Sequence, residues 1–384
     1  MTGTLAPLFG VALGASPAAI GVVISAAFLF PLFLAVPVGT VVDAVGPKPM
    51  LLLGTALLAI APVWIAIAPS FPSLLVAQVL AGLGQLIAVV AAQATVARLG
   101  DGADRESNFG LYGAFVSVGQ LLGPVTAGVL VDLAGFRTAY VVAAVVAAAG
   151  TGAFAVLSAP AGGPAGRSRR PVRVGPRKLL SLTRLPTVQV SLWVSGTVMI
   201  VLVTHGSFLP AFLDGLAVPA SVIGIVISAR SLASVAIRPF MAAVIARLGG
   251  RMRTFLAMLA AAAVGLAMIV AAPSLVLLLA SSALLGLAVG VAQPLTMVGV
   301  VEQIEVHEHG MAFGARITAN RLVQFVAPLL LGLVAQVAGY VALFLVAAAA
   351  VAGTVAALTA RRDRFALIER DAPAPELHAD AEGR

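Results

Sequence analysis

The feature that most constrains the fold of this 384-residue chain is the length of its uncharged apolar stretches. Residues 51–97 contain no Asp, Glu, Lys or Arg, and residues 1–50 contain only Asp43 and Lys48. An uncharged helix of about 20 residues spans the ~30 Å hydrocarbon layer of a bilayer. Only 10% of all residues are charged, whereas a soluble domain has about 25%. The chain is therefore predicted to be an all-α polytopic membrane protein.

Eleven apolar spans follow one another along the chain. We expect helices near residues 18–42, 48–68, 72–97, 107–131, 136–158, 188–213, 219–246, 252–271, 274–300, 309–335 and 338–360. A stretch rich in Gly, Pro and Arg at 159–186 separates the fifth span from the sixth. The polar tail at 361–384 has a composition typical of disorder.

The sequence also repeats itself at about half its length. The segment IGVVISA at 20–26 returns as IGIVISA at 223–229, which is 203 residues later. Further matching pairs are 204 residues apart: Gly82/Gly286, Gly110/Gly314, Gln120/Gln324, Pro124/Pro328, Gly128/Gly332 and Gly135/Gly339. A repeat in one register predicts two similar bundles in tandem. We expect an N-terminal bundle at 1–158, a linker at 159–186 and a C-terminal bundle at 187–360.

The repeat also accounts for the odd number of spans. Pro7 and Phe9 match Pro210 and Phe212 at the offset of 203, so residues 1–12 correspond to the last turns of the 188–213 helix. We therefore expect that the first of twelve helices is truncated in this sequence. The alternative is an eleven-span protein with a short re-entrant start. A signal peptide is not indicated, because residues 1–17 contain no basic residue.

Basic residues alternate between the two sides of the predicted membrane. The linker carries seven of them, and further ones lie in the stretches 43–48, 98–105, 247–253 and after residue 360. On the other side, the stretches 13–18, 69–73, 214–219, 272–275 and 336–339 contain no Lys or Arg, and Arg137 is the exception. The positive-inside rule then places the linker and the C-terminus in the cytoplasm, in a multi-pass protein of the cytoplasmic membrane. The net charge of +8 thus reflects topology, and nucleic acid is not expected as a partner.

Two motifs give the chain a resemblance to a known family. The loop motif of the major facilitator superfamily, G-x-x-x-D-x-x-G-x-[RK], resembles the run formed by Gly39, Asp43, Gly46 and Lys48. The fifth-helix motif of its drug/solute antiporter-like branch resembles Gly110, Gly119, Gly123, Pro124 and Gly128, although Ala127 stands where a Gly is usual. The resemblance covers residues 1–360. It implies two six-helix bundles, a central cavity and alternating access.

The loop motif also has a physical interpretation. Gly39 would allow close helix approach, and Asp43, at the end of its helix, would face a neighbouring helix N-terminus and offset its partial positive charge. The resemblance implies that this neighbour is the eleventh helix, which would begin near 308–310. Such a contact between the halves would latch one conformation; the alternative is that Asp43 only caps and solvates a loop. In the second half Ala246 replaces the acid, and Arg247, Gly249 and Arg251 follow it. The latch is therefore expected to be asymmetric.

Ionisable residues inside the spans are the best indications of a site, because each is costly in hydrocarbon. We expect Arg230 and Arg321 to face a cavity, where they bind an anionic group or pair with a carboxylate. Their alternative is an interhelical hydrogen bond or snorkelling to the membrane surface. His205 is either a packed polar residue or a proton carrier. The polar residues expected to line a cavity with them are Gln85, Gln120, Gln293, Asn320 and Gln324.

These features predict a secondary active transporter of a small solute, of an efflux type or a proton-coupled antiporter. Coupling to H⁺ would need a carboxylate on the missing first helix, and Gln78 occupies the position where related proton-coupled transporters often carry Arg. The alternative is an anion symporter or uniporter that uses Arg230 and Arg321. A membrane sensor that transports nothing is less consistent with the short loops.

Other classes of function lack the residues that they need. The chain has no Cys, and the cluster of Glu305, His307, Glu308 and His309 is unsuited to a metal, because neighbouring side chains on one helix face are three or four residues apart. There is no phosphate-binding loop for ATP. We therefore expect a monomer without enzymatic activity, metal or cofactor, whose partners are its solute and the lipid bilayer.

Overall fold

The computed structural model describes residues 1–99, 103–156, 185–271, 274–301 and 309–361. Every regular element in those ranges is helical, which confirms the predicted all-α class. Most of the expected linker, the tail from residue 362, and the positions Glu302, Glu305, His307 and Glu308 lie outside the described ranges.

The first half of the chain forms α1 (Thr2–Ala12), α2 (Pro17–Val45), α3 (Pro47–Ile67), α4 (Phe71–Ala97) and α5 (Ala103–Val156). Proline in the first turn of α2, α3 and α4 favours a helix start there, since its fixed φ suits a position that needs no N–H donor. Helix α5 is broken at Gly135, whose φ of 76° and ψ of 172° are not helical. It therefore contains two spans.

The second half forms α7 (Pro186–Val203), η1 (Thr204–Phe208), α8 (Leu209–Asp214), α9 (Ala220–Ala236), η2 (Arg238–Phe240), α10 (Met241–Leu248), α11 (Arg251–Ala271), α12 (Leu275–Val301) and α13 (His309–Ala360). Helix α13 is broken at Gly339 (φ 82°, ψ 168°). The expected spans at 188–213 and 219–246 are both present, as Val188–Asp214 and Ala220–Leu248. A π-helical turn interrupts the first, and a 3₁₀ turn containing Pro239 interrupts the second.

The number of spans agrees with the prediction. Nine helices in the described ranges are long and apolar enough to cross a membrane, and two of them, α5 and α13, each contain two spans. The eleven predicted spans are thereby confirmed, with α1 as an additional short apolar helix.

The internal repeat has a counterpart in the packing. Phe9 packs against Phe136 and Tyr140 with ring centroids 5.3 and 5.5 Å apart. In the second half Phe212 packs against Tyr340 and Phe344 at 6.0 and 5.4 Å. The residues of the second cluster are the repeat mates of those of the first. Helices α1 and α8 therefore hold equivalent places in the two halves.

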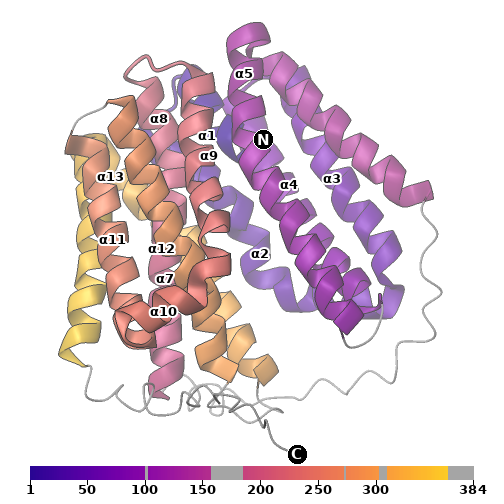
Figure 1. Ribbon diagram of the computed structural model, residues 1–384. Helices are drawn as coiled ribbons and strands as arrows, with labels where there is room; N and C mark the ends of the chain where they lie inside the picture. The colour runs from indigo at the N-terminus through magenta and orange to yellow at the C-terminus, as the bar shows by residue number, and fades with distance from the viewer. Residues whose placement is uncertain (100–102, 157–184, 272–273, 302–308, 362–384) are drawn as a thin grey trace, which may run out of the picture.

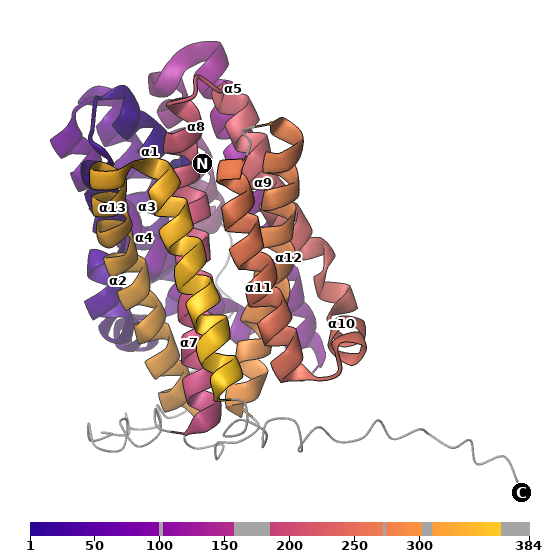
Figure 2. The ribbon, with the colours of Figure 1, turned by 90° about the vertical axis from the view of Figure 1, so that its left-hand side faces the viewer.

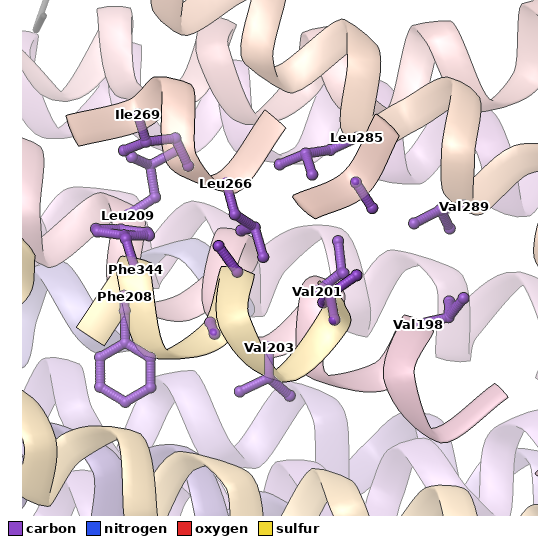
Figure 3. Close-up of a cluster of buried hydrophobic side chains, with 14 of the residues drawn as sticks. Val198, Val201, Val203, Phe208, Leu209, Leu266, Ile269, Leu285, Val289 and Phe344 are labelled. Carbon is purple, nitrogen blue, oxygen red and sulfur yellow. The ribbon is translucent and has the colours of Figure 1, made fainter. Parts of the chain in front are cut away.

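The second half has a continuous apolar core, part of which is drawn in Figure 3. Phe208 and Phe344 are fully buried there, with Leu209 and Leu266 around them. Inside a bilayer such contacts stabilise by close van der Waals packing, because lipid tails are as apolar as leucine.

Helices α2 to α5 lie side by side as one group, and α7 to α13 form the other (Figure 1). The two groups meet along two pairs of helices, α2 with α13 and α5 with α9. Figure 2 shows α13 and α2 on one side of the molecule and α9 toward the other. These two contacts are here called the α2–α13 seam and the α5–α9 seam.

Candidate functional site

Left-handed glycines mark the two ends of the bundle. Gly14, Gly135 and Gly339 have positive φ at one end, here called the turn end. Gly46, Gly249 and Gly250 have positive φ at the other, here called the motif end because it carries the loop motif. In Figure 1 the turn end is at the top, and α10 lies at the bottom.

The two seams are hydrogen-bonded at equivalent positions. The Ser25 hydroxyl donates to the Phe325 carbonyl oxygen over 2.7 Å, and the Ser228 hydroxyl donates to the Leu121 carbonyl oxygen over 2.6 Å. Both serines belong to the repeated segment IG-x-VISA, and both acceptors are repeat mates. The repeated segments 20–26 and 223–229 therefore each form a hydrogen bond to the other half of the chain.

Glycines bring the backbones together along the same seams. A Cβ on Gly21 would collide with the Pro328 carbonyl, and a Cβ on Gly224 would collide with the Pro124 carbonyl. Gly128 meets the Ala220 carbonyl in the same way. At Gly128, and at Gly224 opposite Pro124, only glycine permits this approach.

The motif end has no such packing in the described residues. A Cβ on Gly39, Gly110 or Gly119 would meet no atom within 4 Å. The close helix approach expected at Gly39 is therefore absent from this structure. Phe33 of α2 and Phe115 of α5 are 68% and 69% exposed. The short backbone contacts of both seams therefore lie toward the turn end, and Gly39, Gly110 and Gly119 at the motif end make none.

The loop motif occupies the motif end as expected. Gly46 (φ 100°) joins α2 to α3, and the Lys48 ammonium donates to the Ala155 carbonyl oxygen over 3.2 Å. Asp43 is exposed on the last turn of α2. Its predicted contact with the start of α13 stays a prediction, because residues 302–308 lie outside the described ranges. In the second half Arg247 is exposed, Gly249 ends α10 with a left-handed φ of 75°, and Arg251 begins α11.

One polar cluster lies inside the second half toward the turn end. His205, which is fully buried on η1, shares a hydrogen bond of 2.8 Å between its Nε2 and the Ser282 Oγ of α12. The charge of Arg230 on α9 acts on this ring. The buried atoms Nδ1 of His205, Nε of Arg230, and the hydroxyls of Thr204 and Ser231 have no hydrogen-bond partner. The structure thus pairs His205 with Ser282 and leaves other buried polar atoms of His205 and Arg230 without a hydrogen bond to the described residues.

A second polar cluster lies toward the motif end. Arg316 of α13 is only 3% exposed and donates to the Thr296 Oγ1 of α12 over 2.9 Å and to the Gln293 carbonyl oxygen over 3.5 Å. The Ser195 hydroxyl of α7 donates to the Asn320 Oδ1 over 2.8 Å. Asn320 is thus bonded to α7, and the backbone of Gln293 is bonded to α13 through Arg316.

Arg321 and Gln324 are paired with each other one turn apart on α13. The Arg321 Nη1 donates to the Gln324 Oε1 over 3.0 Å. Gln85 on α4 and Gln120 on α5 are exposed and belong to neither cluster.

Sequence reasoning missed Arg316, because a basic residue near the start of a helix resembles an interfacial anchor. The spacing of Arg316 from other polar residues of the same helix could have identified it. Arg316, Asn320 and Gln324 recur every four residues, which places them on one face of α13.

The charge balance of the second half is uneven. Asp214 is the only acidic residue in 185–301 and 309–361, and it ends α8. No ion pair of Arg230, Arg316 or Arg321 is found in the part of the chain that the structure describes. The groups that bond to Arg316 and Arg321 are neutral, so these charges are hydrogen-bonded but not neutralised.

Comparison with solved structures shows which proteins share this fold. The nucleoside transporter NupG matches with a TM-score of 0.79 over 93% of this chain and 94% of that chain, at 16% identity. A bacterial homologue of the human lysosomal transporter Spinster, in an inward-facing and occupied conformation, matches with 0.75 over 97% of both chains at 13% identity. The peptide transporter POT in complex with sulfate matches with 0.76 over 96% and 92% at 15% identity. Identities this low show the fold alone.

Sequence comparison adds a short match and a long one. The Danio rerio protein named "Probable vesicular acetylcholine transporter-B" is 32% identical over 128 residues, which is 33% of this chain and about a quarter (26%) of that protein. The family model described as Major Facilitator Superfamily matches residues 1–216 and again 192–382. With the eleven spans and the repeated seams, this match shows that the chain is a multi-pass membrane protein and belongs to the Major Facilitator Superfamily.

Proposed function

We propose that this transporter moves a small anionic solute by alternating access between its two halves. The observation that carries the proposal is the set of three arginines inside the second half, Arg230, Arg316 and Arg321, which have no carboxylate partner among the described residues. A charge inside a membrane protein normally faces a partner or a cavity. An anionic solute would supply the missing negative charge.

The two polar clusters suggest how such a solute would be held. At the turn end, Arg230, His205 and Ser231 offer unused buried donors. Toward the motif end, Arg316 and Arg321 are already oriented by Thr296 and Gln324. Guanidinium groups bind carboxylate and phosphate through paired hydrogen bonds. A solute with one anionic group near each cluster, such as an organic dicarboxylate or phosphoester, fits this arrangement.

The names of similar proteins do not decide the solute. Acetylcholine, named for the short match, is a quaternary ammonium ion, which arginines would repel. The peptide and nucleoside transporters share only the fold. The anionic proposal therefore rests on the charges of this chain.

The proposal is tested by ligand-dependent thermal stability of the purified protein. Pooled organic anions, organic cations and neutral sugars are screened, and each hit is measured again on Arg230→Ala, Arg316→Ala and Arg321→Ala. Arg137→Ala is the control, since Arg137 is exposed at the turn end. We expect anions to stabilise the native protein and the control but not the three variants. A cationic hit that is indifferent to all three arginines would refute the proposal.

Proton-coupled antiport, of the efflux type, is the second candidate function. It is favoured by His205, whose Nδ1 is buried and makes no hydrogen bond to the described residues, because an imidazole nitrogen can accept and release a proton. Solute flux in proteoliposomes would be compared with and without a pH gradient. A rate that does not respond to the gradient would reject the coupling.

The orientation and the loop latch remain part of the same proposal. Positive-inside bias supports a motif end that faces the cytoplasm, which makes this conformation open to the inside. Asp43 would then latch the opposite conformation when the motif end closes. Labelling of an engineered cysteine at exposed Ala246 by an impermeant reagent on intact cells tests the orientation; labelling there would contradict it.

A further inference from the structure

One acidic side chain crosses the α5–α9 seam at the turn end. The carboxylate of Asp132, on the last turn of α5 before Gly135, accepts two backbone hydrogen bonds from the start of α9. Its Oδ1 accepts from the Ala220 N–H over 3.0 Å and its Oδ2 from the Ser221 N–H over 2.8 Å. The first half of the chain thus caps a helix of the second half.

The equivalent place in the α2–α13 seam is built differently. The repeat mate of Asp132 is Gln336, and the repeat mate of Pro219 is Ser16. Ser16 caps its own helix α2 by accepting from the Ala19 N–H over 3.3 Å. Pro219, at the N-cap of α9, makes no side-chain cap. Helix α2 is therefore capped from within, whereas α9 depends on Asp132.

The position of the acid on its own helix supports a role across the seam. Asp132 lies at the C-terminal end of the first span of α5, just before the break at Gly135. A carboxylate there faces the negative end of the helix dipole of that span, which is unfavourable. The N-terminal end of α9 offers a positive partial charge and two N–H groups without a helical partner. The favourable contacts of Asp132 are thus with the other half of the molecule.

We propose that Asp132 is a latch that holds the turn end closed and sets the balance between the two access states. Opening the turn end separates α5 from α9, so both hydrogen bonds must break at that step. The other seam repeats the serine and glycine contacts but lacks this latch. The inference rests on the proposed alternating access and is independent of the solute.

The test uses spin labels, which is straightforward because the native chain has no cysteine. One pair, Ile67→Cys with Val276→Cys, reports on the turn end, and both side chains are exposed at 74% and 76%. A second pair, Val45→Cys with Ala246→Cys, reports on the motif end from exposed positions. Distances are measured by pulsed electron paramagnetic resonance in lipid nanodiscs, without added solute.

Asp132→Ala removes both acceptors and is expected to lengthen the turn-end distance and shorten the motif-end distance. Hydrogen bonds to a charged group stabilise the state in which they form, which here is the state with the turn end closed. Their loss should therefore raise the ratio of turn-end-open to turn-end-closed molecules about tenfold or more. Asp132→Asn, which keeps one acceptor, should give a smaller shift in the same direction. It also serves as the test if the alanine variant does not fold.

Gln336→Ala is the matched control at the repeat mate. It should leave both distances as in the native protein. Unchanged distances in folded Asp132→Ala and Asp132→Asn would overturn the proposal. An equal shift in Gln336→Ala would also overturn it, because the effect would then be general weakening of the turn end. Since no solute is present, a failed anion screen does not affect the result.

Discussion

Gly128→Ala tests the idea that the α5–α9 seam closes by backbone contact. The added methyl group would overlap the Ala220 carbonyl and lie 2.8 Å from the Ser221 backbone nitrogen. Both neighbours are backbone atoms, so they cannot rotate away, and α5 and α9 must separate. Overpacking of this kind costs about 1–3 kcal/mol. The gain in helix propensity of about 1 kcal/mol applies to both access states and cancels from their ratio.

The ratio of turn-end-open to turn-end-closed molecules should therefore rise by roughly 5- to 150-fold. The spin-label pairs described above measure it directly. Gly353→Ala is the control, since a Cβ there meets no atom within 4 Å. The reasoning fails if Gly128→Ala and Gly353→Ala give the same distances as the native protein.

Three further predictions concern stability and closure. Phe344→Ala should lower the free energy of unfolding in detergent by about 3–5 kcal/mol, because Phe344 is fully buried, whereas Phe33→Ala at a 68% exposed position should change it little; equal losses would contradict this. Gly135→Ala should lower it by about 1–3 kcal/mol, since a φ of 76° with a ψ of 172° is strained for alanine, and an unchanged value would refute that reasoning. Ser228→Ala and Ser25→Ala should each weaken turn-end closure by about 1 kcal/mol in the spin-label assay; a clear difference between them would show that the seams are not equivalent there.

Much of the architecture could be predicted, because a helix that spans a bilayer needs about 20 consecutive apolar residues. Uncharged length fixed the spans, and the repeat predicted two similar halves. The same repeat contains residues that the structure places in the seams, Ser25 with its mate Ser228 and Pro124 with its mate Pro328, although their contact with the other half was not predicted. These residues recur because each half must offer the same surface to the other.

Details that depend on three-dimensional contact could not be predicted. The π-helical turn at Thr204–Phe208 has the sequence THGSF, whose residue spacing does not distinguish a π-turn from an α-helix. Arg316 was not singled out from the sequence, because its bond to Thr296 joins two helices and leaves no local motif. Asp132 was passed over because its partners are backbone N–H groups of another helix, which no side-chain motif reveals. The two arginines expected in a cavity remain a prediction, since their solute is unidentified.

Solute uptake by proteoliposomes tests the central claim most directly. The vesicles contain no ATP, and uptake of a stabilising organic anion is compared with that of its neutral ester or amide analogue. The account predicts saturable uptake of the anion down its gradient, little uptake of the neutral analogue, and at least a tenfold loss of anion uptake in Arg321→Ala. Equal uptake of anion and analogue by the native protein, unaffected by Arg321→Ala, would contradict it.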